Sequence, residues 1–416
     1  MTQKCHFCGS QNFRMIVDLG KMPLANSYIV SPHLSETILP LSLQICENCS
    51  LVQSPTFSDP AGIFNNYAYL SSTSSSWVEH AGKFCEEMQT RGIIKNGSRI
   101  LEIACNDGYL LQSLDQKAFD IKGIEPATNI ANIARGKGLD VIDEFFSEKL
   151  AKKLSSSGYS ADLIVANNVF AHTPYLRDFI KGLRTLLSKE GMISLEVQYL
   201  PTLIKDKLFD TIYHEHFSYH NLLCMQQMFA SEALDIVDCE LLPTHGGSIR
   251  VFVQHQSNFQ SKRTPRCVEL FEFERRSEYI SAEGFENFKY SVENNRREIK
   301  GLISKLQDGD RRIIGYGAPA KGNTLINYCG ITKENIDYVT DKSPEKIGKY
   351  LPMSNIPIVH PSEISASRPD AIIIMPWNLK DEIKGELLNS GVRDSAIYTL
   401  LPEIQEVFTP SRRTRQ

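Results

Sequence analysis

The sequence lacks the long apolar runs and the charge excess that mark several large classes of protein. None of its 416 residues belongs to a stretch approaching the ~18 uncharged apolar residues that span a bilayer. The formal net charge is −4, so there is no basic excess of the kind that nucleic-acid-binding domains carry. The opening residues contain no apolar run typical of a signal peptide. We therefore expect a cytoplasmic protein with no nucleic-acid and no membrane partner.

Cysteine is infrequent, yet four of the ten cysteines form two Cys-x-x-Cys pairs, Cys5 with Cys8 and Cys46 with Cys49. In a reducing cytosol such residues are thiols or metal ligands rather than disulfides. Two pairs provide four thiolates for one tetrahedral Zn²⁺. Because four thiolates leave no open coordination position, we expect a structural zinc ion, with His6 as a bystander.

Short apolar runs alternate with helical patterns from about residue 97 onward. Strands are predicted at 98–103, 121–125, 163–166 and 191–197, with a helix at 176–187. Near-continuous apolar strands that alternate with helices indicate a parallel sheet covered on both faces. A charged, helical segment follows, with a long helix predicted at 283–306. A second block then has strands predicted at 312–317, 336–341 and 371–375.

These patterns predict an α/β protein with a doubly wound sheet, a small N-terminal zinc-binding module and a C-terminal Rossmann-like domain. We divide the chain into a zinc module (1–65), a cofactor-binding domain (66–256), a helical connector (257–308) and the C-terminal domain (309–416).

The strand at 98–103 runs into a turn of small residues, Ile103-Ala104-Cys105-Asn106-Asp107-Gly108. Such a turn places a cofactor at the carboxyl edge of the sheet. A dinucleotide site would carry G-x-G-x-x-G, whereas this turn has one glycine. An acidic residue at the end of the next strand can bond the two hydroxyls of a ribose, and a polar turn after a later strand lies at the same edge. The cofactor-binding candidates are Glu102, Ala104, Asn106, Asp107, Gly108, Glu125, Asn167 and Asn168.

The segment 209–220, Phe-Asp-Thr-Ile-Tyr-His-Glu-His-Phe-Ser-Tyr-His, is unusually rich in histidine. It lacks the His-Glu-x-x-His spacing of metalloproteases. Acid–base chemistry fits better, because the unperturbed pKa of histidine suits proton transfer near neutrality. Strand alternation places His214 and His216 on one side and Tyr213 and Glu215 on the other. A polar loop rich in histidine by chance is the alternative, and His172 is either a ligand-facing or a hydrogen-bonded turn histidine.

Two glycine turns suit anionic ligands. In His245-Gly246-Gly247-Ser248 the glycines allow close backbone approach, and Arg250 could hold a phosphate or carboxylate; a plain turn into a final strand is the alternative. The turn at 315–324, Gly-Tyr-Gly-Ala-Pro-Ala-Lys-Gly-Asn-Thr, suits a diphosphate but lacks the Walker spacing.

Taken in this order, the motifs resemble the S-adenosylmethionine-dependent sugar C-methyltransferases that act on nucleotide-linked 4-keto-6-deoxy sugars. The resemblance covers nearly the whole chain. It is carried by the four cysteines, Tyr67-Ala68-Tyr69-Leu70-Ser71-Ser72, Glu102–Gly108, Tyr213–His216, His245–Ser248 and Gly315–Asn323. The family usually has a further glycine where Ala104-Cys105 stands here.

The resemblance implies a class I methyltransferase fold, S-adenosylmethionine as cofactor, and a nucleotide-sugar substrate bound by the C-terminal domain, with thymidine diphosphate more expected than guanosine diphosphate. C3, beside a C4 ketone, is the natural position for C-methylation through an enolate in deoxysugar biosynthesis. We expect His216 to be the base. The other implied active-site residues are Tyr67, His172, Tyr213 and Glu215, with Tyr69 as an alternative to Tyr67. The remaining substrate-binding candidates are Tyr69, His245, Gly246, Gly247, Ser248, Arg250, Tyr316, Lys321 and Asn323.

Three other interpretations stay open. O- or N-methylation of a nucleotide sugar would need no carbanion. An NAD(P)-dependent sugar oxidoreductase would use the glycine turn at 315–322 for its cofactor. A non-catalytic zinc-ribbon scaffold would leave Tyr213 to His216 without a purpose.

Overall fold

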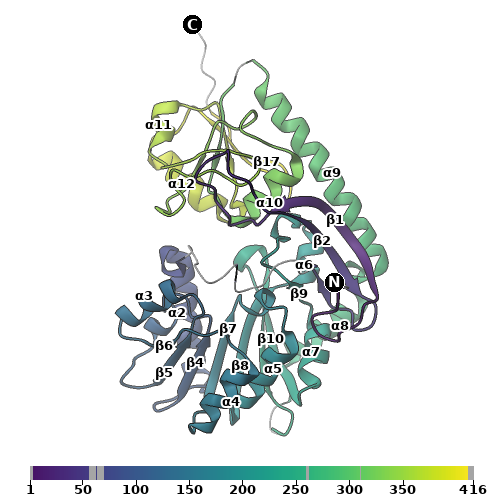
Figure 1. Cartoon of the computed structure of the whole chain (residues 1–416), viewed down its shortest axis with the longest axis vertical. Helices are drawn as coiled ribbons and strands as arrows, with labels where there is room; N and C mark the ends of the chain where they lie inside the picture. The colour runs from purple at the N-terminus through teal and green to yellow at the C-terminus, as the bar shows by residue number, and fades with distance from the viewer. Residues whose placement is uncertain (1–2, 56–61, 63–69, 259–261, 310, 411–416) are drawn as a thin grey trace. The chain divides into compact units, whose positions relative to one another are not determined.

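A computed structural model describes residues 3–55, 62, 70–258, 262–309 and 311–410 (Figure 1). The chain divides into two compact units, each built from separate segments. Unit 1 comprises Met1–Phe13, Cys46–Pro201 and Phe217–Ser277, and unit 2 comprises Arg14–Ile45, Thr202–His216 and Glu278–Gln416. Within the described ranges, every helix is too short or too polar to cross a membrane.

Unit 1 is built on a seven-stranded sheet with the strand order β10-β11-β8-β7-β4-β5-β6. Strands β8, β7, β4, β5 and β6 run parallel, and β11 is antiparallel to both β8 and β10. The strands are β4 (Arg99–Ile103), β5 (Asp120–Ile124), β6 (Asp140–Ile142), β7 (Ala161–Asn167), β8 (Leu187–Gln198), β10 (Leu234–Leu242) and β11 (Ser248–His255).

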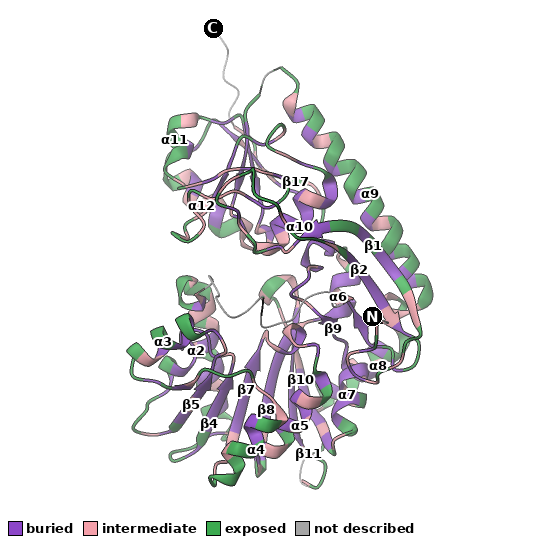
Figure 2. Ribbon diagram, in the orientation of Figure 1, coloured by how far each residue is buried: buried purple, intermediate pink, exposed green. Residues whose placement is uncertain are grey.

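Both faces of this sheet are covered, as Figure 2 shows by the buried strands. Leu101 and Ile103 of β4 pack in one core cluster with residues of α4, α5 and α7, while Ile100 packs in another with residues of α2 and α3. Side chains alternate between the faces, so most positions of β4 and β7 are apolar, with Glu102 as a buried exception. The helices of unit 1 are α2 (Ser75–Thr90), α3 (Thr128–Gly136), α4 (Glu148–Ser156), α5 (Leu176–Leu186), α7 (Leu222–Ala230) and α8 (Pro265–Arg276).

Each of the four strands predicted for this sheet, and the helix at 176–187, is confirmed to within a few residues. The three-residue strand β6 was missed because it is too short to show a period. The final strand after the glycine pair, considered only as an alternative, is β11.

The N-terminal residues contain two long strands that the sequence analysis missed. They are β1 (Phe13–Pro23) and β2 (Ile38–Cys46), which are neighbours in one sheet. In β1, Ile16 and Val17 are both buried although they are adjacent, so the strand does not alternate between apolar and polar residues. In unit 1, the short strands β3 (Val52–Gln53) and β9 (Ser218–Tyr219) pair antiparallel.

Unit 2 contains a six-stranded sheet with the order β14-β13-β12-β15-β16-β17, parallel except for the last strand. Its strands are β12 (Ile313–Tyr316), β13 (Val339–Thr340), β14 (Ile358–Val359), β15 (Ala371–Ile374), β16 (Ala396–Thr399) and β17 (Gln405–Phe408). Its helices include α9 (Ala282–Gln307), α10 (Ala320–Cys329), α11 (Glu363–Ser367) and α12 (Lys380–Asn389), with α6 (Leu200–Lys205) at the start of its middle segment.

The long helix predicted at 283–306 is confirmed as α9, and the strand predicted at 336–341 is reduced to the two residues of β13. The four-part division of the chain stays a prediction. The two compact units divide the chain differently from this prediction, because residues 1–65 contribute to both of them.

Candidate active site and metal centre

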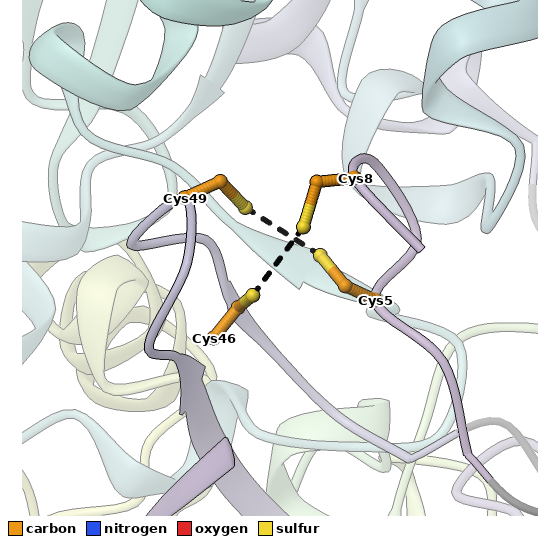
Figure 3. Close-up of side chains that lie close together, drawn as sticks. All are labelled: Cys5, Cys8, Cys46 and Cys49. Atoms are coloured by element: carbon orange, nitrogen blue, oxygen red, sulfur yellow. Dashed lines mark hydrogen bonds between the residues drawn. The ribbon is translucent and has the colours of Figure 1, made fainter. Parts of the chain in front are cut away.

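The four cysteines of the two Cys-x-x-Cys pairs converge in unit 1 (Figure 3). Their sulfur atoms all lie within 4.8 Å of one another. Sγ of Cys5 is 3.5 Å from Sγ of Cys49, and Sγ of Cys8 is 3.5 Å from Sγ of Cys46. A tetrahedral zinc ion with Zn–S bonds of about 2.3 Å holds four thiolates at similar separations. The donor set and the spacing therefore fit a structural zinc ion.

The two cysteine pairs lie in two turns of the same kind. The N–H of Gly9 donates to the carbonyl of Cys5 over 3.1 Å, and the N–H of Ser50 donates to the carbonyl of Cys46 over 2.8 Å. Gly9 and Ser50 both have positive φ, +75° and +60°. Between the first two cysteines, the ring of His6 packs edge-on against Phe217, with ring centroids 6.2 Å apart.

The predicted cofactor turn is a tight loop at the carboxyl end of β4. Ala104, Asn106 and Gly108 have φ values of +56°, +50° and +80°. A Cβ at Gly108 would lie 2.1 Å from Cδ1 of Leu139, so only glycine fits there. The small residues of this motif are therefore required by the backbone as well as by close approach of a ligand.

Glu125 joins two loops at this edge of the sheet. Its Oε2 accepts the N–H of Asn106 and its Oε1 accepts the N–H of Ala127, each over 3.0 Å. Burial raises the pKa of Glu125, and the two N–H groups counteract that effect. Each carboxylate oxygen has a further lone pair, so the side chain can still accept hydrogen bonds from ribose hydroxyls.

The carboxyl edge of the sheet contains several buried polar side-chain atoms that lack a hydrogen-bond partner within the described residues. Among the described residues, Oε2 of Glu102, Oδ1 of Asn167 and Nδ2 of Asn168 have no hydrogen-bond partner. Buried polar atoms are normally paired, so the edge fits a polar ligand. S-adenosylmethionine offers ribose hydroxyls, adenine nitrogens and an amino-acid end of matching character.

Asp107 links the cofactor turn to the segment that precedes α2. Its carboxylate accepts the hydroxyl of Ser72 and the ammonium of Lys137, the latter over 3.0 Å. The N–H of Ser71 donates to Oδ1 of Asn106 over 2.8 Å. The two tyrosines predicted just before this segment, Tyr67 and Tyr69, lie outside the described residues.

His172 is the last residue of a 3₁₀ helix (Phe170–His172) that follows β7 in unit 1. Its N–H donates to the carbonyl of Val169 over 2.8 Å, and the residue is half-buried. The structure thus places His172 in the same unit as the cofactor turn.

A set of aromatic rings in unit 1 joins the predicted candidate His245 to three residues to which the sequence analysis assigned no role. The ring of Trp77 on α2 stacks with those of His80 and Tyr109, at centroid distances of 5.0 and 5.9 Å. The ring of His245 lies edge-on to Trp77 at 5.0 Å. Gly246 and Gly247, with φ of +88° and +122°, form the turn that presents His245. No periodic pattern marks these residues, because three separate segments supply them.

Arg250 forms ion pairs with two glutamates, and its contact with a phosphate or carboxylate of a ligand stays a prediction. Its Nη2 donates to Oε2 of Glu196 and its Nη1 to Oε1 of Glu240, each over 2.8 Å. Burial alone would raise the pKa of Glu196, but the hydrogen bond from His80 and the charge of Arg250 lower it to about 2. With both terminal nitrogens bound to carboxylates, Arg250 stabilises the sheet. Ser248 is likewise internal, since its Oγ donates to the carbonyl of Thr244 over 3.0 Å.

The segment from Tyr213 to His216 is a turn in unit 2, so the predicted strand alternation is wrong. The N–H of His216 donates to the carbonyl of Tyr213 over 2.9 Å. The turn brings the two side chains together, with the Tyr213 hydroxyl 2.8 Å from Nε2 of His216 and ring centroids 4.0 Å apart. Alternation would have separated them on opposite faces.

The tautomer of His216 follows from its second contact. Nδ1 lies 2.9 Å from the carbonyl oxygen of Thr211. A carbonyl oxygen only accepts, so Nδ1 carries the proton and the neutral ring has its lone pair at Nε2. The Tyr213 hydroxyl then donates to Nε2. This arrangement presents a basic nitrogen in a fixed orientation.

Glu215, in the same turn, is buried, with 2% of its surface exposed. Burial raises its pKa to about 7, so its carboxyl group exchanges a proton near neutral pH. His214 is turned elsewhere, with Nε2 3.2 Å from the carbonyl of Pro40.

The second glycine turn connects β12 to α10 in unit 2. Lys321 donates to the side-chain oxygen of Asn378, and its ammonium lies 4.8 Å from the ring centre of Trp377. Nε1 of Trp377 donates to Oδ2 of Asp210 over 2.7 Å. Burial raises the pKa of Asp210 to about 6, against the opposing charge of Lys321. The sequence analysis assigned no role to Asp210 or Trp377.

Helix α10 also holds the turn that carries Tyr213 and His216. The hydroxyl of Thr324 donates to the carbonyl of Ile212 over 3.2 Å. Asn323 is buried, and its amide donates to the carbonyl of Ala25 over 2.6 Å. The remaining candidate, Tyr316, donates its hydroxyl to Oε2 of Glu386 over 2.9 Å.

A doubly wound sheet with a ligand-binding carboxyl edge and a four-cysteine site is typical of a class I methyltransferase that carries a zinc module. Three family models match the chain: "Putative zinc binding domain" over residues 5–64, "Methyltransferase domain" over 78–237 and "C-methyltransferase C-terminal domain" over 243–402. C-methyltransferase NovU of Streptomyces niveus is 30% identical over 395 residues, which is 94% of each chain. The chain therefore belongs to this family of S-adenosylmethionine-dependent C-methyltransferases.

Solved structures of other methyltransferases are similar to part of the chain. The magnesium protoporphyrin IX methyltransferase of Synechocystis PCC 6803 with bound S-adenosylhomocysteine is 13% identical, with a TM-score of 0.34, and the match covers 42% of this chain and 82% of that one. An S-adenosylmethionine-dependent methyltransferase of Clostridium acetobutylicum ATCC 824 is 13% identical, with a TM-score of 0.35, and covers 42% and 90% respectively.

Removal of one zinc ligand should release the metal and loosen unit 1. In Cys49→Ser we expect the zinc content to fall from one ion per chain to nearly none, and the melting temperature to fall by roughly 10 °C or more, because structural zinc contributes folding free energy directly. Elemental analysis and thermal melts measure both. Cys329→Ala, a buried cysteine outside the cluster, should keep its zinc; equal zinc content in both variants would contradict the assignment.

Replacement of the carboxylate at Glu125 should weaken cofactor binding. Glu125→Gln keeps the shape but loses the charge, and a hydrogen bond to a charged group is worth roughly 1.5–3 kcal/mol, or about 10- to 150-fold in affinity. Calorimetric titration with S-adenosylmethionine measures this loss. The exposed control Glu144→Gln should bind like the unmodified protein, and an unchanged affinity in Glu125→Gln would remove Glu125 from the site.

Proposed function

We propose that this C-methyltransferase acts on C3 of a nucleotide-diphosphate-linked 4-keto-6-deoxy sugar, through an enolate, in deoxysugar biosynthesis. The observation that carries the proposal is the pair formed by Tyr213 and His216. The contact of Nδ1 with the Thr211 carbonyl fixes the proton of the neutral His216 ring on Nδ1, so Nε2 is the basic nitrogen. The phenolic hydroxyl of Tyr213 lies 2.8 Å from Nε2. Such a pair suits abstraction of a proton beside a carbonyl group.

Methylation at carbon requires a carbanion, and a ketone provides one. A C–H bond next to a carbonyl is acidic because the electron pair left behind spreads onto the oxygen. In the proposed reaction Nε2 of His216 takes the C3 proton and becomes part of an imidazolium. The N–H at Nδ1 of the imidazolium stays hydrogen-bonded to the carbonyl of Thr211, so the ring keeps its orientation during the transfer.

The Tyr213 hydroxyl has a second role in the proposal. When Nε2 accepts the substrate proton, the hydroxyl is free to donate to the C4 oxygen, on which negative charge develops. Glu215 and His172, with Tyr67, are proposed to hold other sugar oxygens. Tyr69, Lys321 and Asn323 remain proposed substrate contacts, as do His245 and Tyr316.

S-adenosylmethionine, when bound, supplies an electrophilic methyl group that the C3 carbanion takes. The chain's own groups proposed to hold it are Glu125, the turn from Ala104 to Gly108, and the unpaired polar atoms of Glu102, Asn167 and Asn168. The nucleotide is proposed to be thymidine diphosphate, as the motif resemblance favours. The four-cysteine site takes no part in the chemistry, because four thiolates fill the coordination sphere of zinc.

A substrate panel in deuterated water tests the reaction class. We expect one thymidine- or guanosine-diphosphate 4-keto-6-deoxy sugar to gain one methylene unit in mass when S-adenosylmethionine is present. Without the methyl donor, deuterium should enter C3 of the same sugar, because the enolate forms and is reprotonated. A methyl gain with no exchange would contradict the enolate, and no gain on any sugar would contradict the substrate class.

Replacement of the base should slow proton transfer without loss of binding. His216→Asn should lower the rates of methylation and of C3 exchange by roughly 10²–10⁴-fold, the usual contribution of one general base, while the affinity for the sugar changes little. The neighbouring His214→Asn is the matched control and should keep most of the rate, since the ring of His214 hydrogen-bonds the backbone at Pro40 and Leu39. Equal loss in both variants would rule out His216 as the base.

A further inference from the structure

Glu215 of the proposed site is a buried carboxyl group that has no ion-pair partner among the described residues. Among the described residues, no lysine or arginine forms an ion pair with Glu215, whose only hydrogen-bond donor is an asparagine amide. Nδ2 of Asn26 lies 2.8 Å from Oε1 and 2.8 Å from Oε2 of the same carboxyl group. One amide nitrogen therefore donates to both oxygens, a geometry that favours the ionised carboxylate, which only accepts.

Asn26 is far from Glu215 in sequence, and two hydrogen bonds fix its position. It lies in the connection between β1 and β2, within unit 2. The preceding carbonyl, of Ala25, accepts the amide of Asn323 over 2.6 Å. The hydroxyl of Tyr28 lies 2.6 Å from the carbonyl oxygen of Ala318 and 3.2 Å from Oδ1 of Asn26. The glycine-rich turn and α10 thus hold this connection on both sides of Asn26.

From this geometry we propose that Asn26 is a positioning residue for catalysis, which holds the Glu215 carboxylate in its ionised form and in one orientation to accept a hydrogen bond from a substrate hydroxyl. The inference rests on the proposed function. It adds Asn26, a residue of the connection between β1 and β2, to the proposed site that contains the Tyr213–His216 turn.

The choice of an amide has a definite electrostatic consequence. Burial raises the pKa of Glu215 to about 7, and the Asn26 hydrogen bond lowers it from a still higher value. An arginine or lysine in this place would hold the carboxylate ionised at all physiological pH values. The other titratable groups on the segments around it are Tyr213, His214 and His216 in the same turn, Tyr28 beside Asn26, and Lys346, whose ammonium lies 5.3 Å from the ring centre of Tyr28.

Removal of Asn26 should change the pKa of Glu215 in one direction. Asn26 favours the charged form, so its removal raises the pKa of Glu215 and leaves less carboxylate at neutral pH. If the ionised form is the active one, the acidic limb of the pH–rate profile moves to higher pH. The loss of rate is then largest at low pH and recovers as pH rises.

The test compares Asn26→Ala with Ser27→Ala, an exposed neighbour whose side chain has no described contact with Glu215. In Asn26→Ala we expect the acidic limb of kcat/KM for methyl transfer to move up by roughly one pH unit or more, the worth of a hydrogen bond to a charged group. Ser27→Ala should keep the original profile. Asn26→Asp preserves size and serves as the second variant if Asn26→Ala folds poorly; it should shift the limb further, because two carboxylates then face each other.

A double-variant cycle separates positioning from general structural support. Glu215→Gln removes the titrating carboxyl group, so the acidic limb should keep only the contribution of the base His216, and addition of Asn26→Ala to Glu215→Gln should neither shift that limb nor cost much further rate. A rate loss from Asn26→Ala that is the same at every pH, or that is equally large in the Glu215→Gln background, would overturn the proposal.

A direct titration of the carboxyl group needs no sugar and so stands apart from the proposed reaction. Infrared difference spectra of the full chain, with Glu215→Gln to assign the band, should show the Glu215 carboxyl titrating at higher pH in Asn26→Ala than in Ser27→Ala. Unchanged titration would overturn the role of Asn26 even if a sugar is methylated. Failure of every sugar in the panel would instead overturn the proposed substrate while the titration result stands.

Discussion

Buried carboxylates and their need for partners organise the loops of this protein. A carboxylate removed from water is costly unless donors lie next to it. Glu125 meets this need with two backbone N–H groups and thereby holds the cofactor turn. Glu274 does the same for the first turn of α7, through the N–H groups of Leu222 and Leu223. Burial of each acid therefore costs stability, while the hydrogen bonds that it accepts hold a loop in one conformation.

The kind of partner decides what each buried acid can do. Glu196 has an arginine and a histidine beside it, and its pKa falls to about 2, so it stays charged and is structural. Within the described part of the chain, Glu215 has an amide as its one hydrogen-bond donor, and its pKa rises to about 7. The same residue type, buried to nearly the same extent, therefore serves as a permanent ion pair in unit 1 and as a titrating group in unit 2.

The N-terminal segment contributes to both compact units. Its cysteines complete a metal site in unit 1, while the residues between them, Arg14–Ile45, belong to unit 2. Cysteine spacing predicted the metal site, and the motif resemblance supplied most of the candidate active-site residues, which stay predictions. It assigned no role to Asn26, because an exposed asparagine in a loop has no pattern of its own.

Errors of the sequence analysis concentrate where chain segments distant in sequence meet. Local alternation predicted Tyr213 and His216 on opposite sides, whereas a turn brings them to 2.8 Å. Glu196 and Glu240 from neighbouring strands accept hydrogen bonds from both terminal nitrogens of Arg250, contacts that the sequence analysis did not predict. Propensity and period report on neighbours in sequence, and neither can report a partner supplied by another strand.

The amino-acid sequence by itself determined the α/β class, the strands β4, β5, β7, β8, β12 and β15, and the four zinc ligands. These follow from apolar runs, from glycines that the turns require and from cysteine spacing, all of which act over a few residues. Only the tertiary structure decided which nitrogen of His216 is basic, which carboxylates are ion-paired and which is poised to titrate. Those properties depend on burial and on hydrogen bonds between residues far apart in the chain, and both exist only once the chain has folded.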